Sequence, residues 1–190
     1  MKRPVDVALG LVGLSLGALP LAMCAFWIKI VDGGPAFYRQ WRVGRDGWLF
    51  RIVKLRTMRK DAEHQGGPQF ARTCDPRILP GCRWMRRSHI DELPQLWNIL
   101  LGQMSMVGPR PERPEMIQML RPAVPRIDRR LVSRPGLTGL AQIRNGYTND
   151  IAGARRKLAY DLRYMRDRRL VRDLQLLIRT VPKVFDRAGV

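Results

Sequence analysis

The chain has 190 residues, enough for one domain with a modest hydrophobic core. It carries 35 basic against 16 acidic residues, a formal net charge of +19, so we expect partners that bear phosphate or another negative charge. Its three cysteines are an odd number with no framework spacing, which argues against a disulfide-stabilised scaffold and is typical of a reducing compartment.

Residues 7–28 form an uncharged apolar run that is about long enough to cross a bilayer. Pro20 lies inside the run and is expected to kink or break a helix there. Basic residues flank both ends, including Lys2 and Lys29, and positive charge at both ends disfavours a single crossing. We therefore expect a re-entrant helix that breaks at Pro20 and returns to the same side. A spanning helix and a buried helix of a soluble domain remain the alternatives.

The segments 36–43 and 48–57 are rich in aromatic and β-branched residues and flank the turn-forming stretch Gly44–Gly47. This pattern predicts a β-hairpin. Residues 60–82 are polar and contain glycine, proline and aspartate, and we expect them to form a mobile loop.

A helix is predicted over residues 83–101, because the apolar side chains between 93 and 100 recur at helical spacing. Pro94 is tolerated only in the first turn of a helix, which places Asp91 and Glu92 at or beside the helix N-terminus. The helix dipole favours ionised carboxylates there. The acidic pair is therefore either a simple helix cap or a pair of chemical groups.

The remaining elements follow from proline positions and periodicity. Residues 107–114 hold three prolines, which excludes regular structure, and a short helix is expected near 114–120. A turn is predicted within 134–139, around its Pro-Gly pair. Residues 151–190 have an apolar stripe at helical spacing and many basic residues. Such helices either lie on an anionic membrane surface or pack into the domain with a solvated basic face.

Several cations lie in stiff or proline-flanked segments that could face the acidic pair. They are Lys54, Arg86, Arg110 and Arg134. A ring of this kind suits a substrate with two or more phosphates. Adjacent carboxylates can hold Mg²⁺ together with substrate phosphates, and an aspartate can instead attack phosphorus to form an acyl phosphate. The residues thus favour phosphoryl chemistry at a membrane.

The chain resembles the bacterial sugar transferase family, the monotopic polyprenyl-phosphate phosphoglycosyl transferases. Four segments carry the resemblance and keep the family's order: KRPVDVALGLVGL, GGPAFYRQWRVGRDGWLFRIVKLRTM, SHIDELPQLWNILLGQMSMVGPRPERPE and RPGLTGLAQI. The resemblance implies transfer of a phospho-sugar from a UDP-sugar to undecaprenyl phosphate with release of UMP. It also implies a ping-pong mechanism, a requirement for Mg²⁺, and a place on the cytoplasmic face of the bacterial inner membrane.

The resemblance also implies roles for individual residues. Asp91 matches the nucleophile, and Glu92 matches its partner, which is implicated with the metal. The residues expected to bind substrate are Lys54, Arg86, Arg110, Arg134, Asp161 and Tyr164. The helix break matches Pro20, although the family often has serine before this proline and the chain has Leu19.

The sequence thus predicts an α-dominated α+β membrane-associated domain. Residues 1–32 are expected to form the re-entrant membrane helix, and residues 33–190 a cytosolic catalytic domain with a small β-hairpin and basic amphipathic C-terminal helices. The expected partners are a UDP-sugar, undecaprenyl phosphate and an anionic bilayer, and not nucleic acid. The alternative is a basic membrane-surface or nucleic-acid binding module without catalysis. The sequence leaves the sugar and the oligomeric state open.

Overall fold

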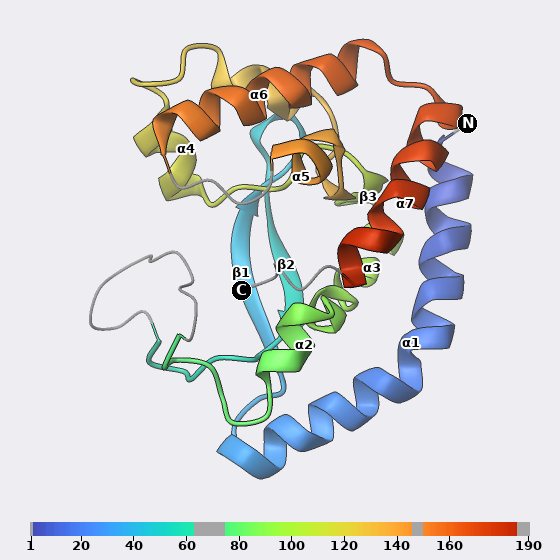
Figure 1. The fold of residues 1–190 in the computed structure, drawn as a ribbon, viewed down its shortest axis with the longest axis vertical. Coiled ribbons are helices and arrows are strands. Elements are labelled where there is room, and N and C mark those ends of the chain that lie inside the picture. The colour runs from blue at the N-terminus through green and yellow to red at the C-terminus, as the bar shows by residue number, and fades with distance from the viewer. Residues whose placement is uncertain (1, 63–74, 146–149, 186–190) are drawn as a thin grey trace.

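The computed structural model describes residues 2–62, 75–145 and 150–185 (Figure 1). This part of the chain is mostly helical with two small sheets, as predicted. The α-helices are α1 (Lys2–Asp32), α2 (Arg83–Arg87), α3 (Gln95–Leu100), α4 (Pro114–Leu120), α5 (Leu140–Asn145), α6 (Ile151–Arg166) and α7 (Leu170–Phe185). The strands are β1 (Phe37–Val43), β2 (Leu49–Leu55), β3 (Ser105–Val107) and β4 (Gly136–Thr138), and the 3₁₀ turns are η1 (Arg45–Gly47), η2 (Ile90–Glu92) and η3 (Ile127–Val132).

Helix α1 is continuous, with Pro20 inside it, and its ribbon bends partway along its length (Figure 1). A proline removes one backbone hydrogen bond and accounts for such a bend. The helix is long and apolar enough to cross a membrane. It exposes large apolar side chains such as Leu16, Leu19 and Phe26. The structure does not show the expected break and return, so the re-entrant arrangement stays a prediction.

Three glycines of α1 allow the helix to lie close against α3 and the turn before it. A Cβ atom added to Gly13 would lie 2.7 Å from Cδ1 of Leu96, and one added to Gly10 would lie 3.0 Å from Cδ2 of Leu100. Gly17 faces Leu93 in the same way. The glycine spacing in the apolar run therefore serves a helix contact within the chain.

The predicted β-hairpin is confirmed. Strands β1 and β2 pair antiparallel, from Phe37 opposite Leu55 to Val43 opposite Leu49. The turn predicted within 134–139 is wrong, because Gly136–Thr138 forms β4 and pairs in parallel with β3. Local Pro-Gly chemistry favours a turn, whereas the pairing depends on a segment about thirty residues earlier.

The predicted helix over 83–101 is also corrected, because it divides into α2, η2 and α3. His89 interrupts it with a left-handed backbone conformation at φ 54°, and Pro94 stands immediately before α3. The predicted irregular stretch 107–114 is confirmed only for residues 108–113, because Val107 ends β3 and Pro114 begins α4. The short helix expected near 114–120 is confirmed as α4. Residues 63–74 of the predicted mobile loop lie outside the described residues.

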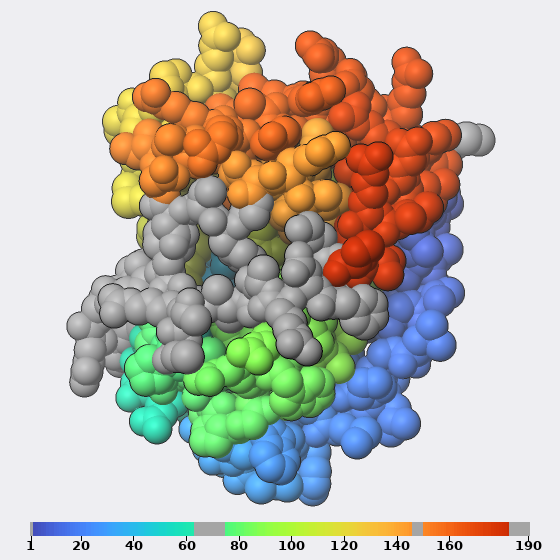
Figure 2. All heavy atoms as spheres, in the orientation of Figure 1, coloured from blue at the N-terminus to red at the C-terminus, as the bar shows by residue number. Residues whose placement is uncertain are grey.

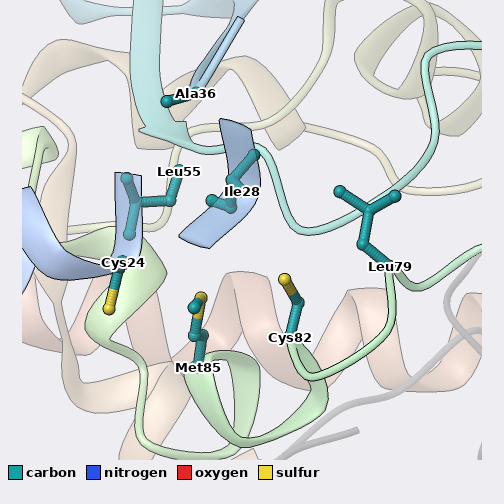
Figure 3. Close-up of a cluster of buried hydrophobic side chains, with 7 residues drawn as sticks. All are labelled: Cys24, Ile28, Ala36, Leu55, Leu79, Cys82 and Met85. Carbon is teal, nitrogen blue, oxygen red and sulfur yellow. The ribbon is translucent and has the colours of Figure 1, made fainter. Parts of the chain in front are cut away.

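The second half of α1 is held by a buried cluster that reaches the end of the hairpin. Cys24 and Ile28 of α1 pack with Leu55 of β2 and with Cys82 and Met85 near α2 (Figure 3). Both cysteines are buried free thiols. The cluster ties the apolar helix to the segment that leads into the acidic pair.

The two C-terminal helices are amphipathic, as predicted. Leu158 and Tyr164 of α6 and Leu176 of α7 are buried, whereas Leu174 and Ile178 of α7 are exposed. Figure 1 shows α6 and α7 meeting at an angle, with α5 beside both, and Asp173 of α7 pairs with Lys2 at the start of α1. One stripe thus packs into the domain, while a second apolar face of α7 stays uncovered.

Candidate active site

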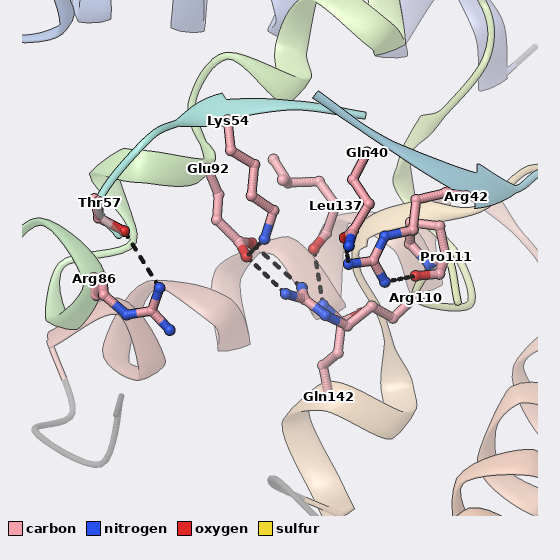
Figure 4. Close-up of polar contacts among 10 residues, drawn as sticks. All are labelled: Gln40, Arg42, Lys54, Thr57, Arg86, Glu92, Arg110, Pro111, Leu137 and Gln142. Atoms are coloured by element: carbon pink, nitrogen blue, oxygen red, sulfur yellow. Dashed lines mark hydrogen bonds and ion pairs between the residues drawn. The ribbon is translucent and has the colours of Figure 1, made fainter. Parts of the chain in front are cut away.

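The acidic pair lies where three separate segments meet. Lys54 comes from β2, Glu92 from η2, and Arg110 from the proline-rich stretch after β3 (Figure 4). Nζ of Lys54 lies 2.5 Å from Oε1 of Glu92. Arg110 donates from Nη2 to Oε1 at 2.7 Å and from Nη1 to Oε2 at 3.3 Å. We call these three residues the Glu92 cluster.

Glu92 is held as an anion by its two cationic partners. Burial alone would raise the pKa of this carboxyl, but the charges and hydrogen bonds of Arg110 and Lys54 outweigh it and hold the pKa well below its usual value. Both carboxylate oxygens are engaged by these partners. Glu92 is therefore better suited to placing the two cations than to acting as a nucleophile or base.

Asp91 is in the opposite situation. Its side chain is buried, with 7% of the residue exposed, and it makes no ion pair or hydrogen bond among the described residues. Burial and the neighbouring charge of Glu92 raise the pKa of Asp91 to about 6, against the pull of Lys54 and the nearby arginines. A carboxylate with a pKa of about 6 is mostly ionised at neutral pH, and burial leaves this one poorly solvated.

The geometry does not support a simple helix cap. Asp91 and Glu92 lie in η2, whereas α3 starts after Pro94 and has no side-chain hydrogen bond at its N-cap. The turn is set by the left-handed His89, whose carbonyl accepts from the amide of Glu92 at 3.0 Å. The two carboxylates therefore lie before the first turn of α3. The Glu92 side chain does not cap this helix and is bonded to Lys54 and Arg110 instead.

Of the two other cations predicted to bind substrate, Arg86 lies near the acidic pair and Arg134 does not contact it. Arg86 donates from Nη1 to Oγ1 of Thr57 at 3.3 Å, and its charge lowers the pKa of Asp91, so it belongs beside the acidic pair. Arg134 is exposed and lies two residues before the start of β4. No contact between its side chain and the Glu92 cluster is present in the described part of the chain.

The sequence reasoning missed a buried ion network that holds the segment of Arg110 in place. Arg130 donates to the backbone carbonyl of Arg110 at 2.9 Å and pairs with Asp161 at 2.8 Å and Glu112 at 3.3 Å. Lys157 also pairs with Glu112. Because the partners are far apart in the sequence, no periodic pattern predicts their pairing. The proline-rich stretch around Glu112 indicates only that this segment is stiff.

Asp161 and Tyr164 are both buried in contacts between elements. Tyr164 donates to Oδ1 of Asp173 at 2.7 Å and accepts from Nζ of Lys2 at 2.7 Å, so it joins α6, α7 and the start of α1. Asp161 pairs with Arg130. These contacts support the fold around Arg110, and a role for either residue in substrate binding stays a prediction.

The residues present fit Mg²⁺ in one way. Among residues 2–62, 75–145 and 150–185, no group of three or more histidine, cysteine, aspartate or glutamate side chains could hold a metal. Mg²⁺ is commonly bound by one or two carboxylates together with substrate phosphates. Asp91 and Glu92 are the carboxylates that could share such an ion with a phosphate-bearing substrate, and their binding of Mg²⁺ stays a prediction.

Comparison with known proteins identifies one matching family and several similar proteins, among them sugar-phosphate transferases and an exopolysaccharide production protein. Residues 1–187 match the family described as Bacterial sugar transferase. The chain is 40% identical over 188 residues to a UDP-glucose:undecaprenyl-phosphate glucose-1-phosphate transferase of Caulobacter vibrioides, covering 97% of this chain and 69% of that protein. It is 37% identical over 192 residues to an exopolysaccharide production protein of Rhizobium leguminosarum, covering 98% and 96%. It is 33% identical over 189 residues to a UDP-N-acetylgalactosamine-undecaprenyl-phosphate N-acetylgalactosaminephosphotransferase of Aeromonas hydrophila, covering 100% and 44%.

Proposed function

The chain belongs to the bacterial sugar transferase family and is an undecaprenyl-phosphate sugar-1-phosphate transferase, and we propose that its reaction runs through a covalent intermediate on Asp91. It transfers a sugar 1-phosphate from a UDP-sugar to undecaprenyl phosphate. The observation that carries the proposal is the contrast within the acidic pair. Glu92 is bound by two cations, while Asp91 is buried and unpaired in the described part of the chain.

In the first proposed step, an oxygen of Asp91 attacks the β-phosphorus of the UDP-sugar. The bond from that phosphorus to the oxygen bridging the two phosphates breaks, and UMP leaves with the electron pair. In the second step, an oxygen of undecaprenyl phosphate attacks the same phosphorus. The bond from phosphorus to Asp91 breaks, which restores the carboxylate and yields the sugar diphosphate lipid.

The cations around the pair stabilise the charge that both steps place on phosphate oxygens. Lys54, Arg86 and Arg110 face two carboxylates, so the group keeps a formal charge of +1 before a substrate binds. Fixed guanidinium and ammonium groups stabilise such charge without reorganisation. Mg²⁺, held by Asp91 or Glu92 with the phosphates, would neutralise part of the remaining negative charge.

We also propose that α1 is a re-entrant helix on the cytoplasmic face of the inner membrane. Both of its ends are bonded to the same body of the protein. Lys2 near the start pairs with Asp173 at 2.9 Å, and Asp32 at the end pairs with Arg56 at 2.6 Å. A helix that crossed the bilayer would have its ends on opposite sides, about 30 Å apart across the hydrocarbon core. The bend in α1, the presence of Pro20 inside it and the exposed apolar face support a helix that enters and leaves one leaflet.

The function is tested by measuring UMP release from a panel of UDP-sugars with undecaprenyl phosphate and Mg²⁺. The relatives are named for glucose and for N-acetylgalactosamine, so both UDP-sugars belong in the panel. We expect release of UMP with at least one sugar. No release with any sugar, together with salt-sensitive binding of RNA or DNA, would instead support the binding-module alternative.

A further inference from the structure

A pocket lined by arginine lies between α5, α6 and α7, apart from the Glu92 cluster. Its volume is about 900 Å³. The basic residues that line it are Arg144, Arg163, Arg166, Arg169, Arg172 and Arg179. None of its lining residues belongs to the Glu92 cluster or to the acidic pair. The proposed transfer reaction therefore leaves this concentration of charge unexplained.

Most of the positive charge in the pocket is uncompensated. Asp167 is the one acidic residue that lines it, and it pairs with Arg172 at 2.7 Å and with Arg166 at 3.5 Å. Arg144, Arg163, Arg169 and Arg179 have no carboxylate partner in the described part of the chain. Guanidinium groups gathered around one cavity repel one another, and a bound phosphate group relieves that repulsion through bidentate hydrogen bonds.

The surroundings of the pocket favour a lipid as the source of the phosphate. Helix α7 also exposes an apolar stripe, in which Val171 is 67%, Leu174 44% and Ile178 70% exposed. Val171 lines the pocket as well, so the stripe and the cationic cavity meet on one helix. A soluble anion would contact only the arginines. A phospholipid can place its phosphate against the arginines and its acyl chains against the apolar stripe.

The start of helix α7 contacts the start of the apolar N-terminal helix. Lys2 of α1 pairs with Asp173 of α7 at 2.9 Å, and in the view of Figure 2 the surfaces of the two helices adjoin. If α1 lies in the membrane, the first turns of α7 are at the level of the headgroups. Long arginine side chains at that level keep their charge in the headgroup layer while apolar neighbours face the acyl chains.

We propose that the pocket between α5, α6 and α7 binds the phosphate headgroup of an anionic phospholipid, with the acyl chains against the apolar stripe of α7. This inference rests on the proposed membrane position of the chain, and not on the chemistry of Asp91. The lipid is a bound partner that fixes the C-terminal helices at the membrane surface, and it is not consumed by the transfer reaction.

The test measures binding of soluble short-chain lipids to the full chain in a non-ionic detergent, by native mass spectrometry. The probes are dihexanoyl phosphatidylglycerol, dihexanoyl phosphatidylcholine, inorganic phosphate and UDP. Because these probes need no bilayer and no catalysis, the result is independent of UMP release. We expect saturable binding of the phosphatidylglycerol and weaker binding of the phosphatidylcholine.

The pocket variant is Arg163→Gln with Arg179→Gln, and the control is Arg126→Gln with Arg129→Gln, which removes the same charge from exposed positions outside the pocket. We expect the pocket variant to bind the anionic lipid about tenfold or more weakly, from the loss of two charged hydrogen-bonding groups, and the control to bind as the parent does. Thermal unfolding checks that both variants fold.

Three results would overturn the inference. Equal weakening in the control would mean that net charge alone attracts the lipid. Equal binding of the two lipids to the parent would mean that the apolar stripe acts without the arginines. Loss of UDP or inorganic phosphate binding in the pocket variant, with phosphatidylglycerol binding unchanged, would assign the pocket to a soluble anion.

Discussion

Arg110 forms a bidentate ion pair with Glu92, in which Nη2 lies 2.7 Å from Oε1 and Nη1 lies 3.3 Å from Oε2. The residues lie in different segments, and Lys54 from the hairpin completes the contact at 2.5 Å. The two carboxylates therefore differ in their surroundings, because Glu92 is bound by two cations whereas Asp91 has no ion pair in the described part of the chain. In our proposal, Glu92 positions the cations that bind the phosphates, and Asp91 is the nucleophile.

The forked contact predicts that lysine cannot replace Arg110. Arg110→Lys keeps the charge but loses the two-pronged geometry, so we expect kcat/KM for the UDP-sugar to fall by about ten- to a hundredfold. UMP release at several UDP-sugar concentrations measures this. Arg129→Lys, at an exposed position, is the control and should change kcat/KM little. A loss of less than twofold in Arg110→Lys would mean that charge alone is required.

The raised pKa of Asp91 predicts an acidic limb in the pH profile. A nucleophilic carboxylate must be ionised, so kcat/KM for the UDP-sugar should rise with pH through about 6. Glu92→Gln removes a negative charge that raises this pKa and frees two nearby cations, and both effects favour the ionised Asp91. The limb should therefore move to lower pH, even though overall turnover falls. A limb that stays in place or moves to higher pH would contradict the coupling.

The contact between α1 and α3 predicts a sensitive position in the apolar helix. Gly13→Ile would force a branched side chain against Leu96, so we expect the free energy of unfolding in detergent to fall by about 1–3 kcal/mol. Ala8→Ile, at an exposed site of the same helix, should have little effect. Leu96→Ala is itself destabilising because Leu96 is buried, but it makes room for the new side chain, so the loss in the double variant should be smaller than the sum of the two single losses. Equal effects at positions 8 and 13 would rule out the packing explanation.

The attachment of both ends of α1 to one body predicts a one-sided topology. Single cysteines at positions 2 and 32, each in a background without the native cysteines, should react with a membrane-impermeant thiol reagent only from the cytoplasmic side. Spheroplasts and inverted vesicles provide the two orientations. Labelling of the two positions from opposite sides would show a helix that spans the membrane.

How far the sequence could predict the structure depended on how local each signal was. The hairpin is predictable because its turn and its two strands, rich in aromatic and β-branched residues, lie within twenty residues. Helix α4 is predictable because Pro114 marks its start. The helix over 83–101 was overestimated, since nothing in the apolar spacing reveals the left-handed backbone of His89. Strand β4 was missed for a related reason, because it exists only through its pairing with β3.

In the candidate active site, too, residues in local motifs were predictable and contacts set by tertiary packing were not. Lys54, Glu92 and Arg110 were named beforehand from motifs, and the structure brings them into direct contact. The network around Arg130 was not foreseen, because its partners at 112 and 161 are set by tertiary packing alone. Burial, which separates the pKa of Asp91 from that of Glu92, is likewise a property of the folded chain.

The most direct measurement is the intact mass of the protein after incubation with its UDP-sugar and Mg²⁺ in the absence of undecaprenyl phosphate. We expect a mass increase of one phospho-sugar, located on Asp91 by peptide mapping and removed when undecaprenyl phosphate is added. Asp91→Asn should show neither the adduct nor UMP release, while remaining folded. An Asp91→Asn protein with near-normal turnover, or an adduct located on another residue, would contradict the assignment of Asp91 as the nucleophile.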